Sequence, residues 1–91
     1  MSSYPATVEI YYWTHCPYCQ RARSLLEEKG VDYKGYDITG DEDARAKMAA
    51  RTGGPKSVPQ IFINNNHIGG CDDLHALDEG GKLDPLLNEA A

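Results

Sequence analysis

The spacing of hydrophobic residues divides the first part of this chain into a strand and an amphipathic helix. Residues 8–12 (Val-Glu-Ile-Tyr-Tyr) are mostly β-branched or aromatic, which predicts a strand. Over residues 17–29 apolar side chains recur at helical spacing: Tyr18, Ala22, Leu25 and Leu26. Pro17 suits the first position of a helix and Gly30 suits its end, so we expect a helix between them.

The middle of the chain predicts a second strand and a second helix. Residues 33–37 form a short strand pattern, and Thr39 with Glu42 fits a helix capping box. Acidic residues then precede basic residues, which is the order that a helix dipole favours. Gly53 and Gly54 end this helix.

The last third predicts a hairpin followed by two helices. Residues 60–63 form a compact strand, 64–66 a turn and 67–69 the returning strand. A third helix is expected over 72–79 before a pair of glycines, and Asp84 with Pro85 can start a short last helix. The predicted order is βαβαββα plus a short C-terminal helix.

Composition and charge limit the possible functions. The 91 residues suit one domain over 1–91, and 41% hydrophobic residues indicate a globular chain. The net charge of −5 argues against a nucleic-acid-binding protein. No apolar run reaches the length of a membrane span, and the first seven residues lack the pattern of a signal peptide. We therefore expect a cytoplasmic protein.

Two of the three cysteines, Cys16 and Cys19, stand at the predicted junction of strand and helix. Unpaired N–H groups at a helix start favour a thiolate, and Cys16 is nearer that start than Cys19, so we expect Cys16 to be the nucleophile. The alternative is half of a zinc site. Zinc normally needs four ligands and the chain has no second Cys-x-x-Cys, so redox chemistry is favoured.

Three separated segments in this order resemble one known family. They are Cys16 to Cys19 (Cys-Pro-Tyr-Cys), residues 57–62 (Ser-Val-Pro-Gln-Ile-Phe) and residues 67–73 (His-Ile-Gly-Gly-Cys-Asp-Asp). The chain resembles the class I dithiol glutaredoxins of the bacterial glutaredoxin 3 type over residues 8–87. The resemblance implies an α/β thioredoxin-like fold in which helices flank a central four-stranded mixed sheet.

The resemblance also implies an activity, a glutathione-dependent thiol–disulfide oxidoreductase. Cys16 would attack glutathione mixed disulfides, and Cys19 would resolve the intermediates formed with protein disulfides. The expected partners are glutathione as co-substrate, glutathionylated proteins, disulfide-containing proteins and, through glutathione, glutathione reductase. No metal, nucleic acid or membrane partner is expected, and the protein is expected to be a monomer.

The glutathione site implied by the resemblance begins at Tyr18, Val58 and Pro59. Tyr18 would line the cleft with its ring. The family carries a cis-proline facing the active cysteine, so we expect the Val58–Pro59 bond to be cis, although most X-Pro bonds are trans. The backbone N–H and C=O of Val58 would then pair with the cysteinyl part of glutathione as an added strand does.

Gly70, Cys71 and Asp72 would complete the glutathione site. Glycine lets the backbone approach a ligand, and the N–H groups at a helix start suit the γ-glutamyl carboxylate. Asp72 would pair with the γ-glutamyl ammonium, whereas Asp73 is expected to cap the helix. Cys71 is interpreted as a contact or buried residue, with a secondary oxidation site as the less favoured alternative.

One position departs from the family pattern. Many glutaredoxins have a lysine three residues before the nucleophile, where it meets the glycine carboxylate of glutathione, but this chain has Trp13. Lys56 or Arg51 could supply the cation instead, or Trp13 could form an apolar wall.

The other basic residues carry little signal. Arg21 and Arg23 are interpreted mainly as a solvated helix face, and a role for His15 in favouring the thiolate is weighed equally against a solvated loop position. His67 and His75 are interpreted as ordinary surface residues.

Two other functions remain open on sequence grounds. In the first, two chains and two glutathiones hold an iron–sulfur centre through Cys16, but Pro17 counts against it because relatives with that role mostly lack this proline. In the second, thioredoxin reductase replaces glutathione as the electron donor, but the segment from Gly69 to Asp72 counts against that.

Overall fold

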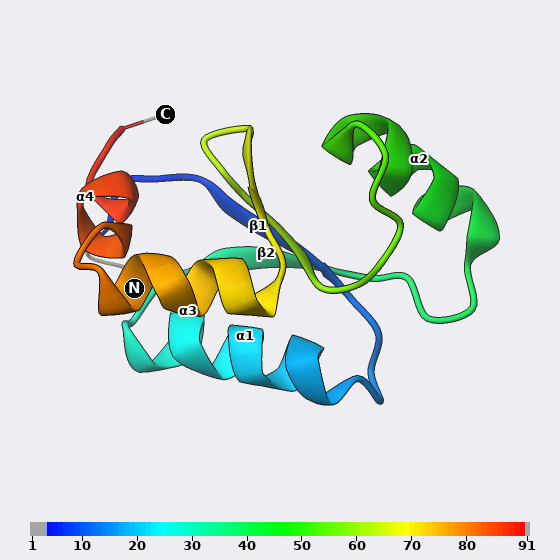
Figure 1. Ribbon diagram of the computed structural model, residues 1–91, viewed down its shortest axis with the longest axis horizontal. Helices are drawn as coiled ribbons and strands as arrows, with labels where there is room; N and C mark the ends of the chain where they lie inside the picture. Colours follow the sequence, from blue (N-terminus) through cyan, green and yellow to red (C-terminus); the bar gives the residue numbers. More distant parts are fainter. Residues whose placement is uncertain (1–3, 91) are drawn as a thin grey trace.

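The computed structural model describes residues 4–90 and contains one four-stranded mixed sheet (Figure 1). The strands are β1 (Val8–Tyr12), β2 (Tyr33–Asp37), β3 (Gln60–Ile63) and β4 (Asn66–Gly69), in the order β2-β1-β3-β4. β1 pairs in parallel with β2, while the β1–β3 and β3–β4 pairs are antiparallel. The mixed sheet expected from the sequence is confirmed.

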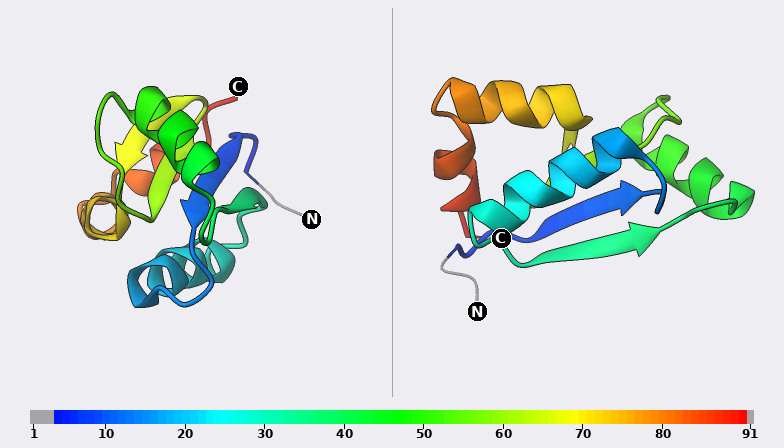
Figure 2. Two further views of the ribbon diagram at one scale, coloured as in Figure 1. Left: turned by 90° about the vertical axis from the view of Figure 1, so that its right-hand side faces the viewer. Right: turned by 90° about the horizontal axis from the view of Figure 1, so that it is seen from below.

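Within residues 4–90, four helices flank this sheet. They are α1 (Pro17–Glu28), α2 (Glu42–Thr52), α3 (Cys71–Glu79) and α4 (Leu83–Leu87). α1 and α3 lie side by side on one face, and α2 lies on the other, as Figures 1 and 2 show from three directions. The predicted order of elements is therefore confirmed, with boundaries that differ from the predictions by one residue at α1, α3 and β4.

Strand alternation separates the apolar core from a second, more polar layer. Val8 and Ile10 of β1 belong to the cluster that also contains residues of α1 and α3, including Leu26 and Leu74. All four of these side chains are at most 2% exposed. Because successive strand residues point to opposite faces, Glu9 and Tyr11 face the α2 side of the sheet.

The turns follow from residues that tolerate a left-handed backbone. Gly53 ends α2 with φ of 83°, a conformation in which a Cβ would be strained. Asn64 and Asn65 between β3 and β4 have φ of 50° and 67°, which suits a two-residue hairpin turn. Asparagine is among the few residues other than glycine that adopt these angles readily.

The predicted capping box of Thr39 and Glu42 is wrong. Asp41 is the N-cap of α2, and its carboxylate accepts a hydrogen bond from the Ala44 N–H at 3.0 Å. The Thr39 hydroxyl instead donates to Asp37 at 2.6 Å and accepts from the Thr14 N–H at 3.0 Å. Thr39 therefore stabilises the loop between β1 and α1, a role that local sequence spacing does not reveal.

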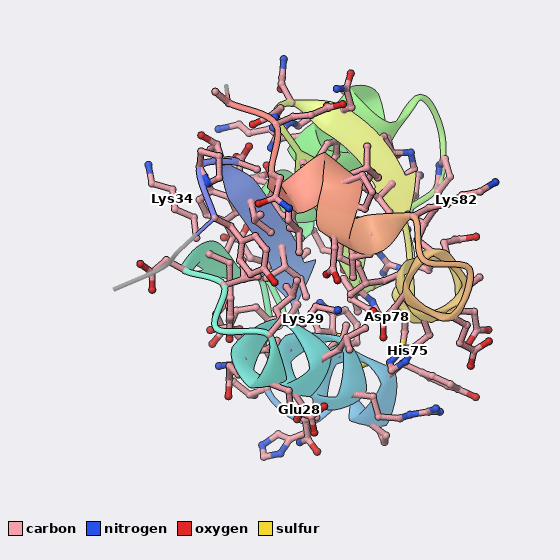
Figure 3. All side chains as sticks on the ribbon, turned by 90° about the vertical axis from the view of Figure 1, so that its left-hand side faces the viewer. Glu28, Lys29, Lys34, His75, Asp78 and Lys82 are labelled. Atoms are coloured by element: carbon pink, nitrogen blue, oxygen red, sulfur yellow. The ribbon has the colours of Figure 1, made fainter. Side chains whose placement is uncertain are left out.

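A group of charged side chains joins the ends of three helices. The Lys29 ammonium that follows α1 lies 2.6 Å from a carboxylate oxygen of Asp78 in α3 and 2.8 Å from one of Asp84 in α4. Lys29 and Asp78 lie in the space between the two helices in Figure 3. Both carboxylates raise the pKa of Lys29, that of Asp78 most, so the lysine stays charged.

Candidate active site

The Cys16 sulfur lies where β1 leads into α1. Cys16 is the N-cap of α1, and its sulfur accepts a hydrogen bond from the Cys19 N–H at 3.3 Å. Its side chain is partly exposed. The N–H group that points at this sulfur is placed to stabilise negative charge on it during disulfide exchange.

Cys19 has a different environment, one helical turn away. Its side chain is fully buried, with 0% exposure. Burial, reinforced by the hydrogen bond with Cys16, raises the pKa of Cys19 to about 12. The Cys19 sulfur therefore stays a thiol near neutral pH, while the more exposed Cys16 sulfur is open to a partner.

The segment containing Val58 and Pro59 faces the Cys16 sulfur. The Val58–Pro59 peptide bond is cis, as expected from the family resemblance. The Cys16 sulfur lies 4.0 Å from the Val58 carbonyl oxygen, which can accept the thiol hydrogen. Two segments 42 residues apart in sequence are thus brought together at the nucleophile.

A cleft of about 350 Å³ lies beside these residues. We call it the active-site cleft; six residues expected around a ligand line it: Tyr18, Val58, Pro59, Gly70, Cys71 and Asp72. Its remaining lining residues are Pro55, Ser57, Gln60, His67, Gly69 and Asp73. The Tyr18 ring stands at its edge with 56% exposure, available to pack on a bound molecule.

The start of α3 forms one wall of the active-site cleft. Gly70 is the N-cap of α3, and the carboxylate of Asp73, the third residue of the helix, accepts a hydrogen bond from the Gly70 N–H at 3.0 Å, so Asp73 helps to cap the helix, as predicted. Asp72 is exposed and lines the cleft. Gly69 has φ of 123°, and a side chain there would collide with Asp73. Because Gly69 has no side chain and Asp73 is bonded to Gly70, main-chain atoms border the cleft at this wall.

Cys71 belongs to the same wall but is only 4% exposed. Burial raises the pKa of the Cys71 thiol above its ordinary value. The expectation that Cys71 is a buried residue is confirmed. A protonated, buried thiol packs as a small apolar side chain and is a poor nucleophile.

The structure changes the expectation about the cation near Trp13. Arg51 is not available there, because its guanidinium lies 2.7 Å from the Glu9 carboxylate on the α2 face of the sheet. Arg45 lies with its guanidinium carbon 5.6 Å from the centre of a Trp13 ring and donates from Nε to the Lys56 carbonyl at 2.9 Å. No sequence motif pointed to Arg45, because this contact depends on how α2 docks.

The Trp13 ring itself contributes apolar surface. Its indole nitrogen is buried and has no hydrogen-bond partner within residues 4–90.

Of the two arginines expected on a solvated helix face, Arg21 is exposed, whereas Arg23 packs 4.2 Å from the centre of the Tyr12 ring. Arg23 also donates to the Tyr33 hydroxyl at 3.2 Å, so the expectation of a solvated Arg23 is wrong.

Two cleft residues were missed at the sequence level. Gln60 and His67, on neighbouring strands, hydrogen bond through their side chains at 2.6 Å and both line the active-site cleft. The sequence interpretation treated His67 as an ordinary hairpin residue. The available signal was the hairpin itself, which brings alternate side chains of β3 and β4 to the same face.

The part of the chain that the structure describes has neither a cluster of metal-ligating side chains nor a helix suited to cross a membrane. Residues 4–90 contain no group of three or more His, Cys, Asp or Glu side chains placed to hold a metal ion. Over the same residues, no helix has both the length and the apolar character that crossing a bilayer requires.

Comparison with known proteins gives consistent matches. The sequence model of the glutaredoxin family matches residues 8–68. A Synechocystis sp. protein named Probable glutaredoxin ssr2061 is 59% identical over 83 residues, covering 91% of this chain and 94% of that protein. Glutaredoxin 3 of Escherichia coli K12 is 55% identical over 82 residues, covering 90% of this chain and 98% of its own length.

A solved structure gives the corresponding match in three dimensions. The crystal structure of a buckwheat glutaredoxin–glutathione complex aligns with a TM-score of 0.79 and 35% sequence identity. The alignment covers 94% of this chain and 78% of the buckwheat chain. The similarity thus extends over almost the whole of the sheet and its helices.

Proposed function

The chain belongs to the glutaredoxin family and has its thioredoxin-like fold, and from this premise we propose how its cysteines and cleft perform the reaction. As a glutaredoxin it is a glutathione-dependent thiol–disulfide oxidoreductase, with glutathione as co-substrate. The proposal assigns roles to individual residues. The observation that carries it is the contrast between a partly exposed Cys16 sulfur at a helix start and a fully buried Cys19.

In the first step, the Cys16 thiolate attacks the glutathionyl sulfur of a mixed disulfide. A Cys16–glutathione disulfide forms, the bond between glutathione and the substrate breaks, and the substrate leaves as a thiolate that takes up a proton. A second glutathione thiolate then attacks the glutathionyl sulfur on Cys16. Oxidised glutathione leaves and the Cys16 thiolate is restored, so each turnover consumes one free glutathione, whose sulfur becomes bonded to the glutathionyl sulfur taken from the substrate.

Protein disulfides require the second cysteine. Cys16 attacks one sulfur of the substrate and forms a mixed disulfide with it. Cys19 then loses its proton and attacks Cys16, and the substrate departs as a dithiol while a Cys16–Cys19 disulfide forms. The 3.3 Å contact between the Cys16 sulfur and the Cys19 N–H supports this role, because it holds the two residues within one helical turn.

The active-site cleft would hold glutathione along its backbone walls. Val58 would pair with the cysteinyl unit, and the N–H groups of Cys71 and Asp72 in the first turn of α3 suit the γ-glutamyl carboxylate, because the Gly70 N–H is already bonded to Asp73. Asp72 would neutralise the γ-glutamyl ammonium, and Tyr18 and Pro59 would pack against the ligand. Arg45 beside Trp13 is the cation that could meet the glycine carboxylate in place of the missing lysine.

The wider setting is also a proposal. We expect residues 1–91 to form one glutaredoxin domain that works as a monomer in the cytoplasm. Its protein partners would be glutathionylated proteins and disulfide-containing proteins. The support is chemical, because exchange at Cys16 requires only an accessible disulfide and a reducing supply of glutathione.

The proposal is tested by reduction of a small glutathione mixed disulfide, coupled to NADPH through glutathione reductase. Cys16→Ser should abolish activity, because no sulfur remains to attack, whereas Cys19→Ser should largely retain it. Ser24→Ala, on the exposed side of α1, is a matched control that should behave as the unaltered protein. Full activity in Cys16→Ser would contradict the assignment of the nucleophile.

A further inference from the structure

Three side chains form a polar wall along one side of the active-site cleft: Ser57, Gln60 and His67. Gln60 is 4% exposed and is the only buried polar side chain within residues 4–90. Its Nε2 lies 2.9 Å from the Ser57 carbonyl oxygen and 3.3 Å from the Ser57 hydroxyl, and its Oε1 lies 2.6 Å from Nε2 of His67. Both ends of the buried amide are therefore used.

The hydrogen bonds of Gln60 determine which ring nitrogen of His67 carries a proton. A carbonyl oxygen can only accept, so the Gln60 nitrogen must face Ser57 and the Gln60 oxygen must face His67. The oxygen also can only accept. His67 must therefore donate from Nε2, which fixes the neutral ring as the Nε2–H tautomer.

The Phe62 ring packs against one side of the His67 ring. The two ring centres lie 5.2 Å apart, and the Arg51 guanidinium lies 3.9 Å from the centre of the Phe62 ring. Arg51 is in turn bonded to Glu9. His67 is exposed overall, but one side of its imidazole packs on the Phe62 ring and the residue borders the active-site cleft.

We propose that His67 is a positioning residue for the ligand segment of the active-site cleft. His67 orients the Gln60 amide, and Gln60 holds the carbonyl and hydroxyl of Ser57. Ser57 directly precedes Val58, whose backbone faces the Cys16 sulfur. This inference rests on the proposed function for its kinetic consequence, but the hydrogen-bond chain itself does not depend on any ligand.

The hydrogen-bond chain is tested first, without glutathione. Long-range ¹H–¹⁵N NMR spectra of the reduced protein at a pH where His67 is neutral should show a protonated Nε2 and an unprotonated Nδ1. His67 is identified by comparison with His67→Gln. An Nδ1–H tautomer would overturn the proposal, whatever the activity of the protein.

The kinetic consequence is tested with two variants that differ in one donor. Glutamine can place an amide N–H near the position of Nε2, whereas leucine cannot donate. His67→Leu should raise KM for the glutathione mixed disulfide about 3–10-fold with little change in kcat, as loss of one hydrogen bond in a positioning chain predicts. His67→Gln should restore KM to within about 2-fold of the unaltered protein, since it returns that bond.

Controls separate this proposal from folding and from the proposed function. Asn66→Ala changes the exposed neighbouring residue of β4 and should leave KM unchanged. If His67→Leu does not fold, His67→Asn replaces it, because the shorter amide does not reach Gln60 and should also raise KM. An unchanged KM in the folded variant overturns the positioning role, whereas inactivity of the unaltered protein would contradict the proposed function alone.

Discussion

The two faces of the sheet are built from the same strands but have opposite chemistry. On the α1 and α3 side, Val8, Ile10, Ile61 and Ile63 form a continuous apolar core. On the α2 side, the intervening positions carry Glu9, Tyr11, Gln60 and Phe62, and these make ion pairs, hydrogen bonds and ring contacts. The period of two in the strand sequence is the whole cause of this division.

Each face positions a different part of the active-site cleft. The apolar face anchors α1 and α3, whose first turns hold Cys16 and the wall at Gly70. The polar face holds Gln60 and His67, which lie beneath the segment that leads to Val58. The comparison therefore predicts that changes on the apolar face away from the first turns of α1 and α3 act mainly on stability, whereas changes on the polar face also alter the cleft.

The largest effect is expected from Leu26→Ala on the apolar face. Leu26 is 0% exposed, and its truncation removes buried methyl groups and leaves a cavity. The free energy of unfolding should fall by about 2–5 kcal/mol, measured by urea denaturation. KM should stay unchanged at temperatures where the variant is folded. Glu28→Ala, at an exposed position two residues on, should change stability little, and a similar loss there would contradict the explanation.

A smaller loss is expected from Arg51→Ala on the polar face. The substitution leaves the Glu9 carboxylate, whose side chain is 14% exposed, without its guanidinium partner, although Tyr36 still donates to it at 3.0 Å. The free energy of unfolding should fall by about 1–3 kcal/mol. KM should also rise, because Arg51 supports the Phe62 ring behind His67.

A double-mutant cycle isolates the Arg51 effect. Arg51→Ala and Glu9→Gln should be non-additive by about 0.5–3 kcal/mol if the two side chains act as a pair. Lys47→Ala on the same helix is exposed and serves as the matched control. Strict additivity would show that the ion pair does not stabilise this face.

The elements of this fold could be predicted from the sequence because their signals are local. The alternation in 8–12 and the helical spacing after Pro17 each lie within one element, so tertiary contacts are not needed to identify them. The start of α2 was predicted wrongly because Thr39 bonds with Thr14, which is 25 residues away. A local sequence pattern cannot show that Thr39 bonds with Thr14 and leaves the capping of α2 to Asp41.

The same distinction explains which site residues could be predicted. The residues around Cys16, Val58 and Gly70 stand in contiguous motifs, so the family resemblance was enough to predict that they share one cleft. Gln60 and His67 meet through the pairing of β3 with β4, and Arg45 reaches Trp13 through the docking of α2. Those contacts are properties of the folded molecule, since no motif in the sequence joins their partners.

The acid sensitivity of the two faces provides a further test. The hydrogen bond from Arg51 lowers the pKa of Glu9 below its ordinary value of 4.5. A carboxyl whose folded-state pKa is lowered stabilises the protein above its unfolded-state pKa, and this contribution is lost as the pH falls through the folded-state value. Glu9→Gln should therefore be less stable than the unaltered protein at about pH 7, and the difference should shrink below about pH 4.

Urea denaturation at several pH values, with Glu28→Gln as an exposed control, measures this difference. The control should follow the unaltered protein at every pH, because its carboxylate is exposed to solvent. A Glu9→Gln variant that loses stability with acid as steeply as the unaltered protein would place the acid-sensitive group elsewhere.

The smallest effect is expected from Lys29→Met. This variant tests whether the Lys29 ion pairs on the apolar side stabilise the protein as much as the Arg51–Glu9 pair beneath α2. The Lys29 side chain is 17% exposed, but Asp78 is 33% and Asp84 is 56% exposed, so water and salt weaken both pairs. Methionine keeps the apolar part of the stem. The free energy of unfolding should fall by at most about 1 kcal/mol, and the loss should shrink in high salt. A salt-independent loss as large as that of Arg51→Ala would mean that the Lys29 ion pairs hold α1, α3 and α4 together. In that case ion pairs would stabilise both faces of the sheet, and the contrast between an apolar face and a polar face would be too simple.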